Sequence, residues 1–159
     1  WRRLAAGGVR ALTSRRAFEP GTLGRYKTTS RLAWNLARDE ARARGADEAL
    51  LVAADGELLE GATSNVFVVA GGALLTPPLD RNVLPGIVRG RVLALAARLG
   101  IPARETPIGP GVLARAEEVL LTNSVQEIAW VAELDGAALP SRAVGEALAA
   151  AWRQSVKPG

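Results

Sequence analysis

The sequence predicts a single domain of the mixed α/β class, in which short strands and helices alternate along the chain. Its 159 residues are 48% hydrophobic, which is enough to bury one sizeable core. Apolar residues recur at helical spacing in some segments and form short runs between Gly and Pro turns in others. Neither internal repeats nor low-complexity stretches occur, which favours one unit over an array.

The individual elements follow from these patterns and from the turn residues between them. Helices are predicted over residues 28–44, 87–99, 110–115 and 141–154. Strands are predicted over residues 9–13, 49–53, 57–60, 66–70, 73–76, 103–108, 118–121 and 128–134. We expect the four strands between residues 49 and 76 to pair as an antiparallel meander. In the first helix, Leu32 and Leu36 are expected on the apolar face and Arg38 on the polar one.

The composition excludes several kinds of chemistry. The chain has no cysteine and no histidine, which removes disulfides, thiolate or imidazole metal ligands and the Ser-His-Asp triad. A net charge of +4 raises the question of nucleic-acid binding, but the arginines are spread along the chain and mixed with acids. We therefore expect neither a metal nor a nucleic-acid partner.

The sequence also bears on the location of the protein. No apolar run reaches the roughly 18 residues that indicate a membrane-spanning helix, and the segment after Trp1 lacks an apolar signal stretch. We therefore expect a soluble, cytoplasmic protein that does not act on a membrane. The chain contains no methionine, so we expect further residues upstream of Trp1.

Lys27 is the first candidate for chemistry. Of 20 basic residues only Lys27 and Lys157 are lysines, and Lys157 lies in the C-terminal tail. A lysine amine can form an imine with an aldehyde or a ketone, whereas an arginine guanidinium cannot. The alternative is that Lys27 is a solvated surface charge, which is the usual role of a single lysine.

Three further segments carry polar groups at the ends of predicted elements. Glu60 ends a strand before a run of small polar residues, and its alternative role is that of a turn acid. Gly86 precedes a helix whose first N–H groups can bind a phosphate, although many helices begin this way without a ligand. Asn123 and Ser124 end another strand, either as a phosphate or carboxylate contact or as a polar turn. Together with the amine, these groups form the set that a pyridoxal-phosphate site needs.

Four motifs combine these residues. They are Tyr-Lys-Thr-Thr-Ser-Arg-Leu at 26–32, Leu-Glu-Gly-Ala-Thr-Ser-Asn-Val-Phe at 59–67, Thr-Pro-Pro at 76–78 with Leu-Pro-Gly-Ile-Val-Arg at 84–89, and Glu-Val-Leu-Leu-Thr-Asn-Ser at 118–124. Their order and spacing resemble those of fold-type IV pyridoxal-phosphate enzymes, the group of the class-IV aminotransferases and aminodeoxychorismate lyase. The resemblance implies the C-terminal, cofactor-binding domain of the D-amino-acid-aminotransferase-like architecture, with pyridoxal 5′-phosphate as cofactor.

The same resemblance assigns roles to the candidate residues. It implies that Lys27 holds the cofactor as an aldimine and moves the substrate proton as general acid and base. Glu60 pairs with the pyridine nitrogen and keeps it protonated. The phosphate is held from two corners by Gly86, Ile87, Val88, Asn123 and Ser124. Many relatives carry Thr where this chain has Val88, so one hydroxyl contact is missing.

The resemblance also implies how the chain is organised. Residues 1–24 form a segment or linker leading from an N-terminal domain that has no counterpart here, and residues 25–156 form the pyridoxal-phosphate-binding domain. Relatives form dimers with the site near the subunit interface, so a homodimer acting on a small amino substrate is expected.

A few positions bear on which member of the family this is. Leu32 stands where branched-chain aminotransferases usually carry Tyr, and Asn123 and Ser124 stand where they carry Gly and Thr. With Arg31, these residues resemble aminodeoxychorismate lyase, which eliminates pyruvate and leaves 4-aminobenzoate. The alternatives are a branched-chain or D-amino-acid aminotransferase and, in a different class, a non-catalytic fragment or relative that only dimerises or binds a ligand.

Overall fold

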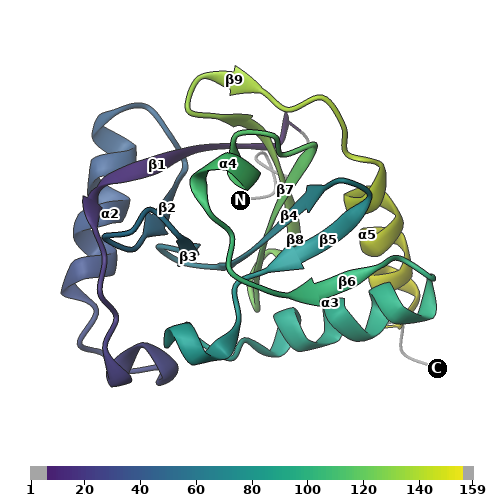
Figure 1. The fold of residues 1–159 in the computed structure, drawn as a ribbon, viewed down its shortest axis with the longest axis horizontal. Helices are drawn as coiled ribbons and strands as arrows, with labels where there is room; N and C mark the ends of the chain where they lie inside the picture. Colours follow the sequence, from purple (N-terminus) through teal and green to yellow (C-terminus); the bar gives the residue numbers. More distant parts are fainter. Residues whose placement is uncertain (1–6, 156–159) are drawn as a thin grey trace.

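The computed structural model describes residues 7–155, and its centre is one curved, nine-stranded sheet (Figure 1). The strand order is β3-β2-β1-β8-β7-β4-β5-β6, with β9 paired to β8. The strands are β1 (Val9–Ala17), β2 (Glu48–Val52), β3 (Leu58–Gly61), β4 (Asn65–Ala70), β5 (Ala73–Thr76), β6 (Ala103–Glu105), β7 (Glu118–Asn123), β8 (Glu127–Leu134) and β9 (Ala137–Ala138). Leu58 of β3 bridges to Ile108, just beyond β6, so the two ends of the sheet come together. Lys157 lies outside the described residues.

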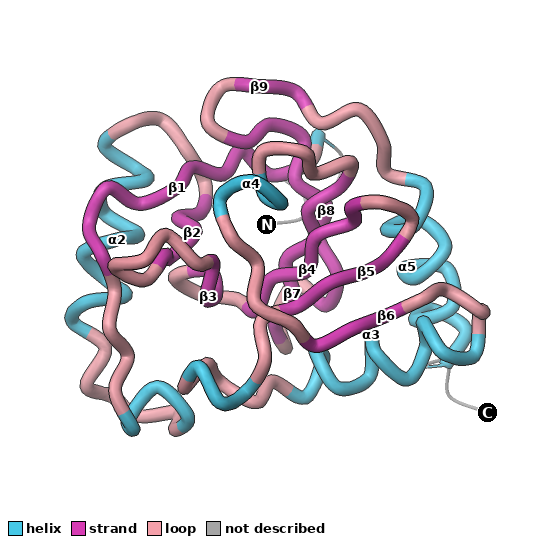
Figure 2. Tube along the Cα trace, in the orientation of Figure 1, coloured by secondary structure: helices cyan, strands magenta, loops and turns pink. Residues whose placement is uncertain are grey.

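The longer helices cover the outside of this sheet, whereas the short helix after β6 packs against the hydrophobic cluster inside it (Figure 2). They are α2 (Leu32–Ala43), α3 (Ile87–Arg98), α4 (Pro110–Leu113) and α5 (Ala143–Ser155), with 3₁₀ turns η1 (Thr22–Arg25) and η2 (Leu79–Arg81). Helix α2 packs on β1 and β2, whereas α3 and α5 pack on each other and on β7. Three hydrophobic clusters result, one inside the curved sheet, one under α2 and one under α3 and α5. No helix in the described range is long and apolar enough to cross a membrane.

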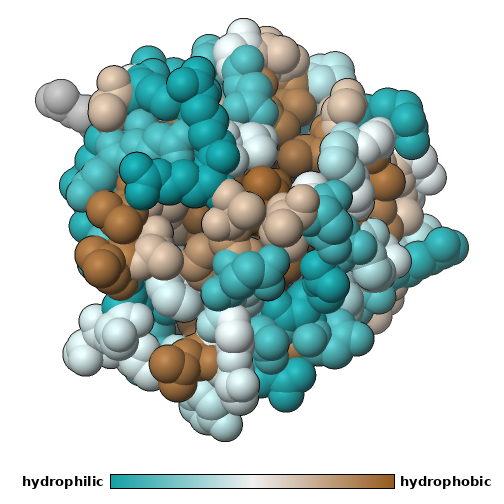
Figure 3. All heavy atoms as spheres, turned by 60° about the vertical axis from the view of Figure 1, so that its left-hand side comes forward, coloured by the Kyte–Doolittle hydropathy of each residue, from teal (hydrophilic) through white to brown (hydrophobic). Residues whose placement is uncertain are grey.

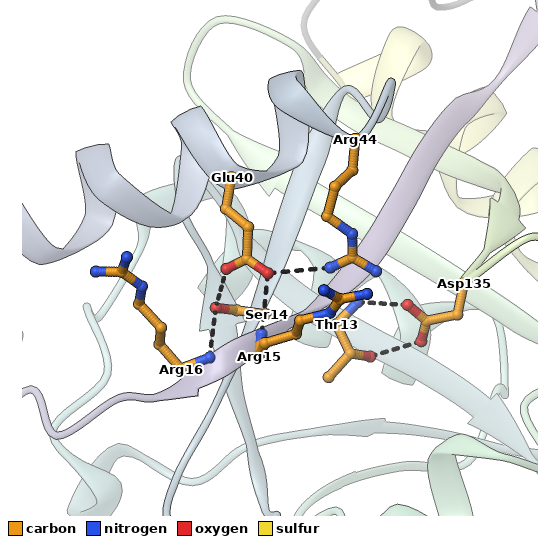
Figure 4. A network of polar contacts seen from close by, with 7 residues as sticks. All are labelled: Thr13, Ser14, Arg15, Arg16, Glu40, Arg44 and Asp135. Atoms are coloured by element: carbon orange, nitrogen blue, oxygen red, sulfur yellow. Dashed lines mark hydrogen bonds and ion pairs between the residues drawn. The ribbon is translucent and has the colours of Figure 1, made fainter.

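Strand β1 is fastened to its neighbours by side-chain hydrogen bonds (Figure 4). Thr13 donates its backbone N–H and its hydroxyl to the carboxylate of Asp135, both at 2.7 Å. On the other side, Glu40 of α2 accepts from the Ser14 hydroxyl at 2.8 Å and the Arg15 N–H at 3.1 Å. The strand expected over 9–13 is therefore longer than predicted. It pairs with β2 and β8 inside the sheet, although the sequence placed it in a linker segment.

The predicted mixed α/β class is confirmed, and most predicted elements are present, but the expected four-strand meander is wrong. The pairs β2–β3 and β4–β5 do form antiparallel hairpins. However, β3 pairs with β2 and not with β4 within the described residues, while β4 pairs with β5 and with the distant strand β7. The chain turns at Gly61, where the N–H of Gly61 donates to the Ser64 carbonyl at 2.8 Å. The two hairpins therefore diverge at this turn.

The expected apolar face of the first helix is also wrong. Leu32 is 71% exposed and Leu36 is 43% exposed, whereas Trp34, Ala37 and Ala41 are buried. Residues 34, 37 and 41 lie on one face of a helix, nearly opposite Leu32 and Leu36. The small alanines let α2 approach the sheet closely, so the buried face is the one without the leucines. The helix also begins at Leu32 rather than at residue 28, which leaves the residues after Lys27 as a loop.

Candidate active site

A cavity of about 540 Å³ lies where β3 and β7 end and α3 begins. All seven residues that the sequence singled out line this cavity: Lys27, Glu60, Gly86, Ile87, Val88, Asn123 and Ser124. Its other lining residues are Arg31, Gly61, Thr63, Ser64, Asn65, Leu84, Pro85, Thr122, Val125 and Gln126. The sheet order explains the convergence, because β4 pairs with β7 and so brings two distant motifs side by side.

Lys27 reaches the cavity from the loop between η1 and α2, and its side chain is exposed. Arg31, four residues further on, lines the same cavity and is half-buried. The guanidinium of Arg31 lies 4.3 Å from the centroid of the Trp34 ring, a cation–π distance that holds it in place. The cavity therefore carries two positive side chains, of which only the lysine can form an imine.

Glu60 is the buried acid of the cavity, at 2% exposed surface. Its two carboxylate oxygens accept separate hydrogen bonds, one from the Trp34 indole N–H at 2.6 Å and one from the Leu84 backbone N–H at 3.1 Å. Burial raises the pKa of Glu60, and these donors and the charges of Arg31 and Lys27 oppose that rise. The carboxylate is therefore held in one orientation at the wall of the cavity.

The start of α3 presents unpaired N–H groups to the cavity. Gly86 is its N-cap in an extended conformation, and no side chain among residues 7–155 caps the helix. The N–H groups of Ile87 and Val88 have no acceptor within the helix, and helix N-termini favour anions. The Val88 side chain is buried in the cluster under α3, so only its backbone can serve a ligand. This corner can bind a phosphate through the backbone alone.

The segment Thr122 to Ser124 forms the opposite corner. The Thr122 hydroxyl oxygen is buried and has no hydrogen-bond partner within residues 7–155. The Asn123 side chain is engaged by protein groups: its oxygen accepts from the N–H of Val125 at 2.9 Å and of Gln126 at 2.8 Å. Asn123 therefore shapes this turn, while Ser124 is exposed at the rim. Thr122 is the group here that lacks a partner.

Sequence reasoning missed a second buried carboxylate behind the cavity. Glu48 is 3% exposed and accepts hydrogen bonds from the Ala49 N–H, from the N–H and hydroxyl of Thr63, and from the Ser64 hydroxyl. It thereby fixes the turn that carries two lining residues of the cavity. Burial raises the pKa of Glu48 as well. The signal in the sequence was an acid at the start of a fully apolar strand, in Glu48-Ala49-Leu50-Leu51-Val52.

Apolar side chains are exposed around the mouth of the cavity. Ile87 and Val125 line it and are 76% and 79% exposed, and Leu23 and Tyr26 are also exposed near Lys27. Figure 3 shows apolar groups among hydrophilic ones on the side of the molecule that carries α2. Large exposed apolar groups next to a site indicate a surface that contacts something else.

Sequence comparisons connect this site to a known family. The family model described as amino-transferase class IV matches residues 3–134. A protein of Methanocaldococcus jannaschii assigned as a branched-chain-amino-acid aminotransferase is 37% identical over 145 residues, covering 90% of this chain and 50% of that protein. The branched-chain-amino-acid aminotransferase of Escherichia coli is 39% identical over 101 residues, covering 64% of this chain and 33% of that enzyme.

Solved structures confirm the fold-type IV architecture. The branched-chain aminotransferase of Thermoproteus uzoniensis with norvaline matches with a TM-score of 0.84 at 35% identity, covering 92% of this chain and 50% of that one. A Legionella pneumophila protein assigned as a 4-amino-4-deoxychorismate lyase matches with a TM-score of 0.86 at 26% identity, covering 92% of this chain and 56% of that one.

The chain spans about half or less of the length of these relatives. Their family comprises enzymes that use pyridoxal 5′-phosphate, as the sequence motifs implied. The matched region includes β1 through β8 and every residue of the cavity. The chain belongs to the class IV aminotransferase family.

Proposed function

We propose that the cavity binds pyridoxal 5′-phosphate and that Lys27 is the residue bonded to it. The observation that carries this proposal is the convergence on one cavity of an amine, a buried carboxylate and a free helix N-terminus. In this proposal Glu60 contacts the ring nitrogen, and the N–H groups of Ile87 and Val88 contact the phosphate. Ser124 adds a hydroxyl from the opposite corner.

The donors and acceptors of the cavity fit this cofactor. The phosphate needs several donors, and the start of α3 supplies N–H groups that no side chain in the described range caps. Thr122 offers a buried hydroxyl that has no partner in the described part of the chain. Leaving such groups unpaired is costly, so a ligand with acceptor oxygens would satisfy them. The ring nitrogen needs an acid or its conjugate base, which Glu60 provides.

The cofactor, when bound, supplies an electron sink for the pair released as a substrate Cα–H bond breaks. The chain's own residues do the rest. Lys27 provides the amine that fixes the cofactor and, once displaced by the substrate amine, can accept and return a proton. Glu60 holds a proton at the ring nitrogen, and the partly buried Leu84 adds an apolar group to the wall of the cavity.

The reaction we propose first is amino transfer from an α-amino acid. Support comes from the relatives, because the protein of M. jannaschii and the enzyme of E. coli are both branched-chain-amino-acid aminotransferases by name. The second candidate is elimination of pyruvate from aminodeoxychorismate. It is favoured by Arg31 and Leu32 in the first motif and by the likeness to the L. pneumophila protein.

The substrate pocket of the whole enzyme needs more than this chain, in our proposal. The relatives are about twice as long, and the exposed Ile87 and Val125 at the mouth suit a covering polypeptide, either a further domain or a second subunit of a homodimer. We therefore propose residues 25–156 together with β1, which lies between β2 and β8 in the same sheet, as the cofactor-binding unit. We expect full activity only with the remaining part of the enzyme.

Borohydride reduction of the protein with pyridoxal phosphate, followed by peptide mass spectrometry, tests the cofactor assignment. We expect a phosphopyridoxyl group on Lys27 and its loss in Lys27→Ala. Label on another lysine, or none in the wild-type chain, would leave the non-catalytic alternative. If Lys27 carries the group, assays on the unreduced, full-length enzyme separate the two reactions. They compare transfer of the amino group of a branched-chain amino acid to 2-oxoglutarate with pyruvate release from aminodeoxychorismate.

A further inference from the structure

The carboxylate of Glu60 is held by two donors that come from different elements. The Trp34 indole N–H, from α2, donates at 2.6 Å, and the Leu84 backbone N–H, from the loop before α3, donates at 3.1 Å. Trp34 is only 7% exposed, and its N–H contacts the similarly buried carboxylate of Glu60. Position and orientation of the carboxylate therefore depend on Trp34 as much as on the strand that carries Glu60.

Both groups can only donate, and this determines which form of Glu60 they favour. An indole N–H and a backbone N–H have no acceptor atom, so they stabilise the ionised carboxylate more than the neutral acid. Burial acts in the opposite direction and raises the pKa of Glu60. The other charged groups that act on Glu60 are Arg31 and Lys27, and both favour its ionised form. Without the indole donor, burial would therefore raise the pKa of Glu60 further.

Arg31 strengthens the same contact from the cavity side. Its guanidinium lies 4.3 Å from the centroid of the Trp34 ring, within the range of a cation–π interaction. A cation over the ring face draws electron density from the indole and makes its N–H a better donor. The ring is also fixed by Phe18, whose centroid lies 4.7 Å away in an edge-to-face arrangement. Arg31, Trp34 and Glu60 thus form a continuous relay from the cavity to the buried acid.

We propose that Trp34 is a positioning residue that keeps Glu60 ionised and oriented toward the cofactor ring nitrogen, and that Arg31 reinforces it through the indole ring. This inference rests on the proposed function of the cavity, because it assigns Trp34 and Arg31 to the same site. Neither residue needs to touch the substrate. The relay controls how firmly the ring nitrogen keeps its proton.

The ring nitrogen can be observed directly with pyridoxal phosphate that carries ¹⁵N in the ring. Its NMR shift in the loaded full chain reports the pH at which the nitrogen loses its proton. In Trp34→Phe we expect this pH to fall by about one unit, the size of one hydrogen bond to a charged group. We expect a fall of about half a unit in Arg31→Gln and recovery of most of it in Arg31→Lys, which keeps the positive charge. Cofactor dissociation constants should rise about tenfold in Trp34→Phe.

Two controls separate the relay from packing and from overall charge. Phe18→Leu loosens the packing that fixes the Trp34 ring but keeps its N–H, so the ring-nitrogen transition should move much less than in Trp34→Phe. Arg42→Gln removes an exposed positive charge from the same helix and should also leave it unchanged. If Trp34→Phe folds poorly, Arg31→Gln still tests the relay, because it leaves the buried face of α2 intact.

The chain without cofactor provides a second readout. Trp34 favours ionised Glu60, so the difference in Tm between the wild type and Trp34→Phe should increase as the pH rises through the pKa of Glu60. In a Glu60→Gln background the effect of Trp34→Phe on Tm should not depend on pH. A pH-independent loss, or an unmoved ring-nitrogen transition in both Trp34→Phe and Arg31→Gln, overturns the relay. If Glu60→Gln also leaves the ring nitrogen unmoved, the proposed role of Glu60 fails with it.

Discussion

Gly86 is the position at which one added methyl group should do most damage. A Cβ there would lie far inside contact distance of the Asn65 side-chain oxygen and 3.2 Å from Asn65 Cγ. Its φ of −67° is open to any residue, so the need for glycine comes from this close approach and not from the backbone. Asn65 cannot simply turn away, because it is buried and its amide donates to the Leu84 carbonyl at 2.8 Å.

The cost of Gly86→Ala can be estimated from these contacts. Overpacking a buried contact costs about 1–3 kcal/mol, and losing the hydrogen bond from Asn65 adds about 1 kcal/mol. Restricting the unfolded chain returns about 0.4–1 kcal/mol. We therefore expect a net loss of about 2 kcal/mol, or roughly 4–8 °C in Tm for a domain of this size. Affinity for pyridoxal phosphate should also fall, because the N–H groups of Ile87 and Val88 move with residue 86.

Gly90 provides a matched control on the same helix. It is exposed, and a Cβ there would meet nothing within 4 Å, so Gly90→Ala should stabilise α3 by about 0.5–1 kcal/mol. Thermal unfolding of both variants without cofactor, and cofactor titration of each, give the comparison. Gly86→Ala combined with Asn65→Ala should recover part of the lost stability, since the clash is relieved. Equal stability and equal cofactor affinity of the two glycine variants would refute the close-packing explanation.

Three further groups of substitutions probe buried or turn contacts of the fold. Glu48 has a raised pKa, so the folded chain holds its proton where the unfolded chain has lost it, and stability falls as the pH rises from about 4.3 to the folded pKa. In chemical denaturation across this pH window, the free energy of unfolding should fall less in Glu48→Gln than in the wild type. Glu48→Ala should lower it by about 3 kcal/mol at every pH, because the groups that donate to Glu48 are left buried without an acceptor. In the same assay, Arg89→Ala should lower the free energy of unfolding by about 2 kcal/mol, because the buried Arg89 donates to the Pro77 carbonyl at 2.9 Å and to Glu105 at 2.7 Å. Glu105→Gln should lower it by less than about 1 kcal/mol, since Glu105 is partly exposed. Asp135→Ala should lower Tm by several degrees, while Asp135→Asn, which tolerates the φ of 50° and keeps an acceptor, should lose less; equal losses would exclude the turn geometry as the cause.

The local elements were accessible from the sequence because they depend on neighbours in the chain. The helix after Gly86 and the hairpin around residues 71 and 72 follow from spacing and turn residues, and the structure has both. The seven candidate residues were found from short motifs, and the fold brings all of them to one cavity. Local patterns of this kind need no knowledge of the tertiary arrangement.

The pairing of distant strands was not accessible in the same way. The sequence favoured pairing β3 with β4 because they are adjacent, but β4 instead pairs with β7 from Glu118 onward. Apolar strands buried on both faces carry no alternation that specifies a partner. The buried face of α2 was misassigned for a related reason. Leucines suggested the core side, while the close approach of the helix to the sheet favoured Ala37 and Ala41.

The missed groups, Trp34 and Glu48, share a physical feature that explains why motif reasoning passed over them. Each acts on the cavity through another residue. Trp34 donates to Glu60, and Glu48 accepts from Thr63 in the turn between β3 and β4. A buried carboxylate is expensive unless donors surround it. The two acids, Glu60 and Glu48, therefore depend on donors from other segments of the chain, and only the folded sheet brings those segments to them. A carboxylate in an otherwise apolar strand predicts that such donors exist, even when the sequence does not say which residues they are.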